Sequence, residues 1–318
     1  TQGVSSAASD VYKRQLQPLL AHGGLAFLYL MAPLCFSPYG TAAAWALAGL
    51  ATLLAGLHLG VRSVLISAFV VQALGGMIYL IFSDGLDQAV VAETLRPLAH
   101  LAFWAPVLLA LAGLLCAWRL YLAGRGARPE LLPLDMNELS HVALFWSAAW
   151  WLLAALGEIS RFVPHERQGH VFLLVAVASL VVTALFALHQ RWPALAVFSL
   201  ALVPLGFAAL LLTWHPAYHP LATLGWVAWP ALFAAHFLML RRVQGLAPEV
   251  LIRVSHVLGC WLLLGVLALE LRFLFFALAE HYNAWRWLGW VLVPCAFLML
   301  MGPVSYTHLR AHETRHDL

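Results

Sequence analysis

Long apolar runs, separated by short polar breaks, fill the sequence from residue 16 to residue 303. A helix needs about 20 apolar residues to cross the hydrocarbon core of a bilayer. Runs of that length predict the membrane spans 16–36, 41–59, 62–82, 98–122, 140–159, 170–189, 192–214, 221–240, 250–271 and 285–301. The predicted fold class is therefore all-α, a polytopic transmembrane helical bundle of about ten spans.

The second and third predicted spans are separated only by Gly60 and Val61. Two residues leave no room for a loop, and glycine adopts the left-handed backbone that ends many helices. The sequence therefore predicts a tight helical hairpin at this point.

Composition supports a lipid environment. Charged residues make up 10% of the chain, against about 25% in a typical soluble domain. The net charge of +3 comes from scattered arginines, so no basic patch for nucleic acid is present. The cysteines Cys35, Cys116, Cys260 and Cys295 lie in apolar runs without a CxxC pair, and we expect neither a metal site nor a cofactor.

Arginine in the short loops predicts the orientation, because positively charged loops stay on the cytoplasmic side. One side has eight arginines, namely Arg62, Arg119, Arg125, Arg128, Arg191, Arg241, Arg242 and Arg253. The other side has five, namely Arg96, Arg161, Arg167, Arg272 and Arg286. This bias favours a bacterial inner-membrane protein with both true ends in the cytoplasm.

The two ends differ from the middle in residue usage. Residues 1–15 contain Lys13, the only lysine, and residues 304–318 are rich in histidine and arginine. Both segments resemble adaptor-derived read-through, so we expect non-native caps at 1–15 and 304–318 around a transmembrane domain at 16–303. Disordered native tails are the alternative. With foreign caps, the middle would be a fragment of a longer protein, whose other helices would be its partners.

The second predicted span has small residues at a spacing of four. They share one helix face and are Ala44, Ala48, Thr52, Gly56 and Gly60. Small side chains let helices approach closely in lipid, where van der Waals contact drives association. This stripe is predicted to pack against another helix, either of this chain or of a second copy in a homo-oligomer.

Glu158 and Arg161 lie three residues apart, a spacing that lets them pair at the end of a span. Trp146 and Trp150 lie one turn apart on the same predicted helix. Two interpretations are open. The group forms an aromatic pocket closed by an ion pair, or it is an interfacial belt with charged side chains that reach the water.

Glu270 lies 17 residues beyond Arg253, which is about 25 Å along a helix. Glu270 and Arg272 are therefore expected near the outer interface, either as functional groups or as solvated side chains. His236 and His256 are expected on neighbouring spans. They could relay protons or begin a metal site, although no third ligand is evident.

Other motifs add little. Asp84, Asp87 and Glu93 fall in a predicted outer loop, where lipid-linked sugar transferases keep a catalytic carboxylate, but where solvated acids are also common. The sequence has no phosphate-binding loop, nucleophile elbow or zinc-protease motif. We therefore expect a protein that is not an enzyme.

The stretch TAAAWALAGLATLLAGLHLGVRSVLISAFVVQALGGMIYL resembles the bacterial family of predicted multi-pass membrane proteins called domain of unknown function 2339. The stretches RWPALAVF and RWLGWVLVP are similar to it as well. The family stretch has a Trp-Ala-Leu-acid-Gly core, which Trp45, Ala46, Leu47 and Gly49 match, while Ala48 replaces the acid. The resemblance implies a polytopic membrane fold and typically a longer protein. It implies no catalytic residue.

Three classes of function remain open from the sequence. The first is an integral inner-membrane component with a structural role in the cell envelope. The second is a transporter or flippase of a small or lipid-linked substrate, which needs a polar cavity at mid-depth. The third is a lipid-linked glycosyl transferase or ligase, which needs an outer-loop carboxylate.

Overall fold

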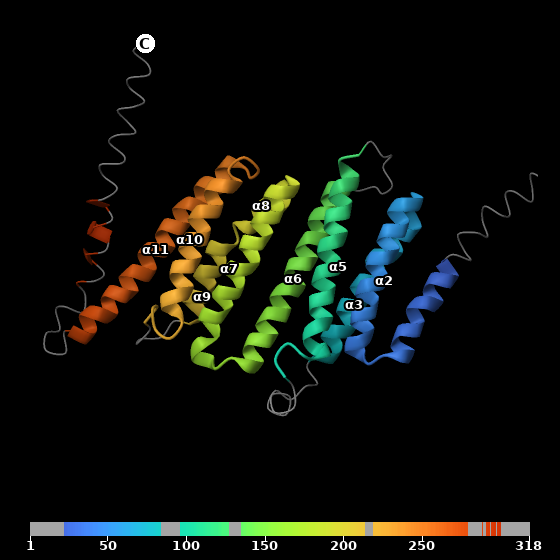
Figure 1. Cartoon of the computed structure of the whole chain (residues 1–318), viewed down its shortest axis with the longest axis horizontal. Coiled ribbons are helices and arrows are strands. Elements are labelled where there is room, and N and C mark those ends of the chain that lie inside the picture. Colours follow the sequence, from blue (N-terminus) through green and yellow to red (C-terminus); the bar gives the residue numbers. More distant parts are fainter. Residues whose placement is uncertain are drawn as a thin grey trace, which may run out of the picture. The chain divides into compact units, whose positions relative to one another are not determined.

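The computed structural model describes residues 22–83, 96–126, 135–213 and 219–278, together with 288, 291–292, 294–296 and 298–299. These residues form helices joined by short turns and contain no strand (Figure 1), so the predicted all-α fold class is confirmed. The chain divides into two compact units, Thr1–Phe162 and Val163–Leu318. The predicted caps at 1–15 and 304–318 lie outside the described residues and stay a prediction.

Unit 1 is built from antiparallel helices (Figure 1). They are the first helix His22–Cys35, α2 Pro38–Leu59, α3 Arg62–Ser83, α5 Leu101–Gly124 and α6 Met136–Phe162. Pro38 begins α2, where its missing N–H costs no helical hydrogen bond. The Ser37 hydroxyl accepts a hydrogen bond from the Gly40 N–H at 3.3 Å and caps the same helix end.

Gly60 and Val61 alone connect α2 to α3, which confirms the predicted tight hairpin. Gly60 has a φ of 69°, and its N–H donates to the Gly56 carbonyl. A Cβ at Gly56 would lie only 2.9 Å from Leu65 Cδ2. The hairpin therefore depends on one glycine for its turn and on another for the close approach of its helices.

Replacement of Gly60 by alanine should lower the stability of unit 1 by about 1 kcal/mol, because a side chain disfavours the left-handed backbone. The measurement is thermal unfolding of the purified protein in detergent, followed by tryptophan fluorescence. Gly60→Asn should lose less, since asparagine tolerates this conformation. Equal melting temperatures for wild type and Gly60→Ala would contradict the prediction.

Small and polar residues hold the core of unit 1 together. Ala42, Ala46 and Ala105 are fully buried, which brings their helices close to neighbouring backbones. The Ser147 hydroxyl donates to the Ala110 carbonyl at 2.7 Å, and the Ser140 hydroxyl donates to the Ala117 carbonyl at 2.8 Å. These two bonds join α6 to α5 at two levels.

A chain of aromatic rings runs through the same core. The ring centroids are 5.5 Å apart for Tyr39 and Tyr79, 5.4 Å for Tyr79 and Trp150, and 5.5 Å for Trp150 and Trp146. Edge-to-face geometry at these distances is favourable. The rings connect α2, α3 and α6, so their positions depend on one another.

Unit 2 contains α7 His165–Gln190, α8 Pro193–Ser199, α9 Leu202–Leu212, α10 Gly225–Val243 and α11 Glu249–Leu278. Its core is a buried apolar cluster to which all of these helices except α8 contribute. The largest of its fully buried side chains are Leu173, Val203, Trp229, Leu232 and Leu262. Close packing at Gly206, whose Cβ would meet Leu262 Cδ2 at 2.6 Å, brings α9 against α11.

The predicted span 192–214 is interrupted between α8 and α9, at Leu200 and Ala201. Pro204 follows, and a proline ring clashes with the carbonyl four residues earlier, here that of Leu200. At the break, the Leu200 N–H donates to the Val197 carbonyl, three residues earlier, at 3.0 Å. The break therefore has a local cause in the sequence.

Seven of the described helices are long and apolar enough to cross a membrane, fewer than the ten spans predicted. They are α2, α3, α5, α6, α7, the combined Pro193–Leu211 and α11. Of the predicted first span, 16–36, the structure describes the apolar helix His22–Cys35. The predicted span 221–240 coincides with α10, which ends in Arg241 and Arg242, and the span 285–301 lies largely outside the described residues.

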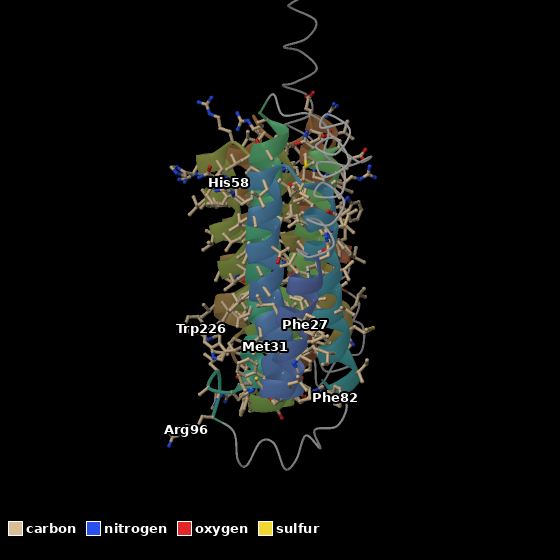
Figure 2. All side chains as sticks on the ribbon, turned by 90° about the vertical axis from the view of Figure 1, so that its right-hand side faces the viewer. Phe27, Met31, His58, Phe82, Arg96 and Trp226 are labelled. Carbon is tan, nitrogen blue, oxygen red and sulfur yellow. The ribbon has the colours of Figure 1, made fainter. Side chains whose placement is uncertain are left out.

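Many of the side chains on the outer surface of the helices are apolar (Figure 2). Phe27 and Met31 on the first helix are 74% and 59% exposed, and Trp226 on α10 is 65% exposed. Apolar surface of this extent is costly in water and favourable in lipid. His58, at the end of α2, and Phe82, at the end of α3, lie at opposite ends of the hairpin (Figure 2).

Candidate functional site

Glu158, near the end of α6, binds the segment that leads into α5. Its Oε1 accepts a hydrogen bond from the Leu98 N–H at 2.6 Å, and its Oε2 lies 3.1 Å from His100 Nε2. Leu98 has a φ of 61°, a backbone region that a branched side chain rarely adopts. The carboxylate thus holds a strained turn in place.

His100 completes this arrangement. Its Nδ1 accepts a hydrogen bond from the Phe103 N–H at 3.2 Å and caps α5. A ring nitrogen that accepts a hydrogen bond carries no proton, so the ring proton is on Nε2. The Nε2–H group therefore donates a hydrogen bond to Glu158. The His100 ring also lies 5.8 Å from the ring of Phe162. We call Glu158, His100 and Leu98 the unit 1 clamp.

Glu270 on α11 makes a comparable arrangement in unit 2. Its Oε2 lies 2.9 Å from His219 Nδ1 and accepts a hydrogen bond from the Leu221 N–H at 3.2 Å. The His219 ring stacks on the Phe273 ring at a centroid distance of 4.0 Å. We call Glu270, His219 and Leu221 the unit 2 clamp. It ties the segment before α10 to α11.

His170 holds the same segment from the side of α7. Its Nε2 lies 3.1 Å from the Pro220 carbonyl oxygen, to which it can only donate. Its Nδ1 lies 3.1 Å from Thr223 Oγ1, and Thr223 has a φ of 52°. As in unit 1, a buried polar side chain stabilises a turn with unusual backbone geometry.

The remaining charged candidates are Arg161 on α6 and Arg272 on α11. The Glu158 carboxylate bonds to His100 and Leu98 rather than to Arg161, whose side chain lies beside the Tyr79 hydroxyl. Arg272 follows Glu270 by two residues on α11 and is partly buried. Glu158 and Glu270 therefore make the same kind of contact, each with a histidine ring and a backbone N–H. Arg161 and Arg272 follow them closely in the sequence.

The ring of Phe237 contacts both His236 on α10 and His256 on α11. Its ring centroid is 4.9 Å from that of His236 and 5.7 Å from that of His256. His256 Nε2 is 3.9 Å from Cys260 Sγ, and His236 Nε2 is buried with no hydrogen-bond partner among the described residues. Within the described ranges, no three His, Cys, Asp or Glu residues group as metal ligands do.

The stripe of small residues on α2 contacts two neighbours within unit 1. Thr52 Oγ1 lies 2.6 Å from the Tyr29 hydroxyl of the first helix, and Gly56 lies against Leu65 of α3. Ala44 and Ala48 are partly buried, and Gly60 caps the helix. Gly49, outside the stripe, packs equally closely, since a Cβ there would meet Gln72 and the Ala68 carbonyl.

The sequence did not indicate that His100 and His219 bind the clamp glutamates, or that His170 binds the turn before α10. His100 directly precedes the apolar run of α5, which is the position of a helix cap. The partner of each clamp histidine is more than 50 residues away in sequence, so no local pattern could indicate the pairing. Asp84, Asp87 and Glu93 lie outside the described residues.

Comparison with protein-family models gives a match over nearly the whole chain. The model of the family described as predicted membrane protein DUF2339 matches residues 4–316. This confirms the resemblance drawn from the sequence and the interpretation as a multi-pass membrane protein. No curated protein and no solved structure matches the chain.

Proposed function

The chain belongs to the DUF2339 family of predicted membrane proteins, and we propose that it is a structural component of the cell envelope in the bacterial inner membrane. The use of polar side chains in the two units supports this proposal most. Serines join α6 to α5, and the two clamps and His170 attach turns to helices. Such bonds make each unit rigid, whereas an ion pump needs ionisable groups along a path.

The effect of a structural component should be proportional to its number of copies, since each copy fills one position in the envelope. In a strain whose copy number is lowered stepwise, resistance to detergent and osmotic shock should fall in proportion to the protein. An enzyme or transporter usually has spare capacity, so full resistance at a small fraction of the normal level would contradict a structural role. Quantitative immunoblotting measures the level in each culture.

A transporter or flippase is the second candidate, because unit 1 contains an apolar cavity of about 190 Å³. Purified protein in liposomes with a fluorescent lipid separates the two functions. A flippase accelerates the movement of the labelled lipid to the outer leaflet, where dithionite quenches it. A structural protein should leave the rate equal to that of liposomes containing an unrelated membrane protein of similar size.

The orientation proposed from the arginine bias places both true ends in the cytoplasm. Reporter fusions after Gly124, at the end of α5, and at Gly245, after α10, should then report the cytoplasmic side. The measurement is alkaline phosphatase and green fluorescent protein activity of paired fusions. Strong phosphatase activity at either position would contradict this orientation.

A further inference from the structure

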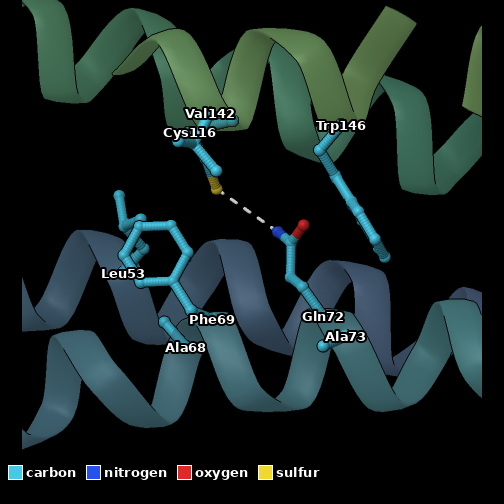
Figure 3. A pocket seen from close by; sticks show the side chains of 9 residues that line it. Leu53, Ala68, Phe69, Gln72, Ala73, Cys116, Val142 and Trp146 are labelled. Atoms are coloured by element: carbon cyan, nitrogen blue, oxygen red, sulfur yellow. Dashed lines mark hydrogen bonds between the residues drawn. The ribbon is translucent and has the colours of Figure 1, made fainter. Parts of the chain in front are cut away.

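The cavity of unit 1 lies between α2, α3, α5 and α6 (Figure 3). Its lining contains no charged side chain and is mostly apolar, with Leu53, Phe69 and Val142 among its members. The Nε2 of Gln72, the most polar lining residue, donates to Cys116 Sγ at 3.3 Å (Figure 3). The surface that an occupant meets is therefore almost entirely hydrocarbon and aromatic carbon.

The size of the cavity fits part of a hydrocarbon chain. Its volume is about 190 Å³. Since a cavity of ~150 Å³ is enough for the six carbon atoms of benzene, this one has room for about seven. A void of this kind leaves its lining without contacts on one side, and a chain that fills it restores them.

The cavity opens at the depth of the acyl chains. Ala73 of α3 and Val142 of α6 line it and are exposed, Val142 to 62%. The lining residues 68–73 lie 6 to 11 residues beyond the start of α3, which is about 9 to 17 Å along the helix. Three residues further, α3 and α6 meet at Gly76, where a Cβ would lie 2.5 Å from Trp150 Cζ2. The opening therefore lies within one leaflet, whose hydrocarbon is about 15 Å thick.

The two helices beside the opening begin at the same end of unit 1. Both run antiparallel to α5. Along α3, Gln72 bonds to Cys116 and Tyr79 bonds to Ala102, so the α5 residue number falls as that of α3 rises. The serine bonds between α6 and α5 run in the same sense. A lipid that lies along the opening would therefore have its head group beside the starts of both helices.

A positive and a negative side chain lie at this end, above the cavity. Arg62 begins α3 and precedes Phe69 and Ala73 by seven and eleven residues, so the three share one helix face. Glu138, in the first turn of α6, precedes Val142 by four residues and shares its face. Both charged residues are exposed, and in the described part of the chain neither is in an ion pair.

This pair of charges selects the head group. A guanidinium binds phosphate oxygens well, and a carboxylate accepts hydrogen bonds from a primary ammonium group, which has three N–H donors. A head group with both a phosphate and a primary ammonium complements Arg62 and Glu138 together. A purely anionic head group would satisfy Arg62 and be repelled by Glu138, and a neutral lipid would use neither charge.

We propose that this site binds one molecule of phosphatidylethanolamine. Its phosphate lies at Arg62, its ammonium group lies at Glu138, and part of one acyl chain fills the cavity past Val142. The proposal does not depend on the structural role proposed above.

The position of the acyl chain is tested by photolabelling. The whole chain is placed in nanodiscs that contain phosphatidylethanolamine with a diazirine in the middle of one acyl chain. Mass spectrometry should locate the label in residues 68–73 and 142–146. Ala73→Phe, which puts a ring into the opening, should remove most of this label. Val70→Phe adds the same ring on α3 at an exposed position outside the lining and should label like wild type.

The head group is tested by native mass spectrometry of the protein with equal amounts of phosphatidylethanolamine and phosphatidylglycerol. Wild type should retain phosphatidylethanolamine preferentially. Glu138→Gln should weaken its binding about 2- to 5-fold, the effect of losing one exposed ion pair, and should abolish the preference. Arg62→Gln should weaken the binding of both lipids. Arg119→Gln, at an exposed position of α5 outside the lining, should behave like wild type.

Equal retention of the two lipids by wild type, or acyl-chain label outside the two segments, would overturn the proposal. So would unchanged labelling of Ala73→Phe, or an unchanged preference of Glu138→Gln, when the melting temperature matches that of wild type. A variant that fails to fold leaves the wild-type label positions and head-group preference as the deciding results. A neutral lipid or a second copy of the chain found in the opening would also overturn it.

Discussion

Replacement of Gly76 by alanine should lower the stability of unit 1 by about 2 kcal/mol, through overpacking between α3 and α6. The new Cβ would lie 2.5 Å from Trp150 Cζ2 and 2.7 Å from Trp146 Cη2. Trp150 cannot move away freely, because its ring also contacts Tyr79, whereas Trp146 borders the cavity of unit 1. The measurement is unfolding in mixed detergent micelles with increasing SDS.

Gly157 on α6 provides the matched control within the same unit. A Cβ there would have Arg161 Nη1 at 3.9 Å as its nearest neighbour, an ordinary contact distance. Gly157→Ala should therefore be neutral or should stabilise the helix by up to about 1 kcal/mol. Similar losses for Gly76→Ala and Gly157→Ala would contradict the prediction, because helix propensity favours alanine at both positions and only Gly76 has the indole contacts.

Replacement of Glu158 by alanine should cost about 3 kcal/mol, because it removes both hydrogen bonds of the unit 1 clamp. The Leu98 N–H and His100 Nε2–H would lose their acceptor, and the strained backbone of Leu98 would lose its support. The same SDS titration measures the loss. Hydrogen exchange should show faster exchange at Leu98 and at the start of α5.

Two variants show whether this effect belongs to the clamp. Glu158→Gln keeps one acceptor oxygen and should lose less than Glu158→Ala. Glu249 on α11 is 84% exposed in a 3.8 Å pair with Arg253, so Glu249→Ala should change stability by no more than about 0.5 kcal/mol. A folded, fully stable Glu158→Ala protein that loses its cellular function would contradict a purely structural role for the clamp.

Much of the fold was predictable because the features that define it are local. A span must satisfy its backbone hydrogen bonds within its own helix, so an apolar run of sufficient length indicates a helix by itself. The turn at Gly60 and the break before Pro204 are also properties of single residues. The structure shows seven such helices; of the other predicted spans, 16–36 and 285–301 are only partly described, and 221–240 corresponds to α10, which ends in Arg241 and Arg242.

The candidate sites were less predictable because a polar side chain can bond to any group that the fold brings near. Glu158 and Glu270 were candidates from the sequence. The only partner that the sequence indicated for Glu158 was Arg161, at helical spacing. Its observed partners are about 60 residues away, in another helix and its preceding turn. The cavity around Gln72 likewise combines residues from four helices that share no sequence pattern.

The sequence by itself determined that this protein is helical, spans a membrane several times and belongs among the DUF2339 proteins. These properties follow from the free energy of placing each segment in lipid, which depends on that segment alone. Only the tertiary structure decided which glycines pack against indole rings, which turns the glutamates bind and where buried donors lack an acceptor. Those features depend on distances between helices, which packing sets only when the whole unit is assembled.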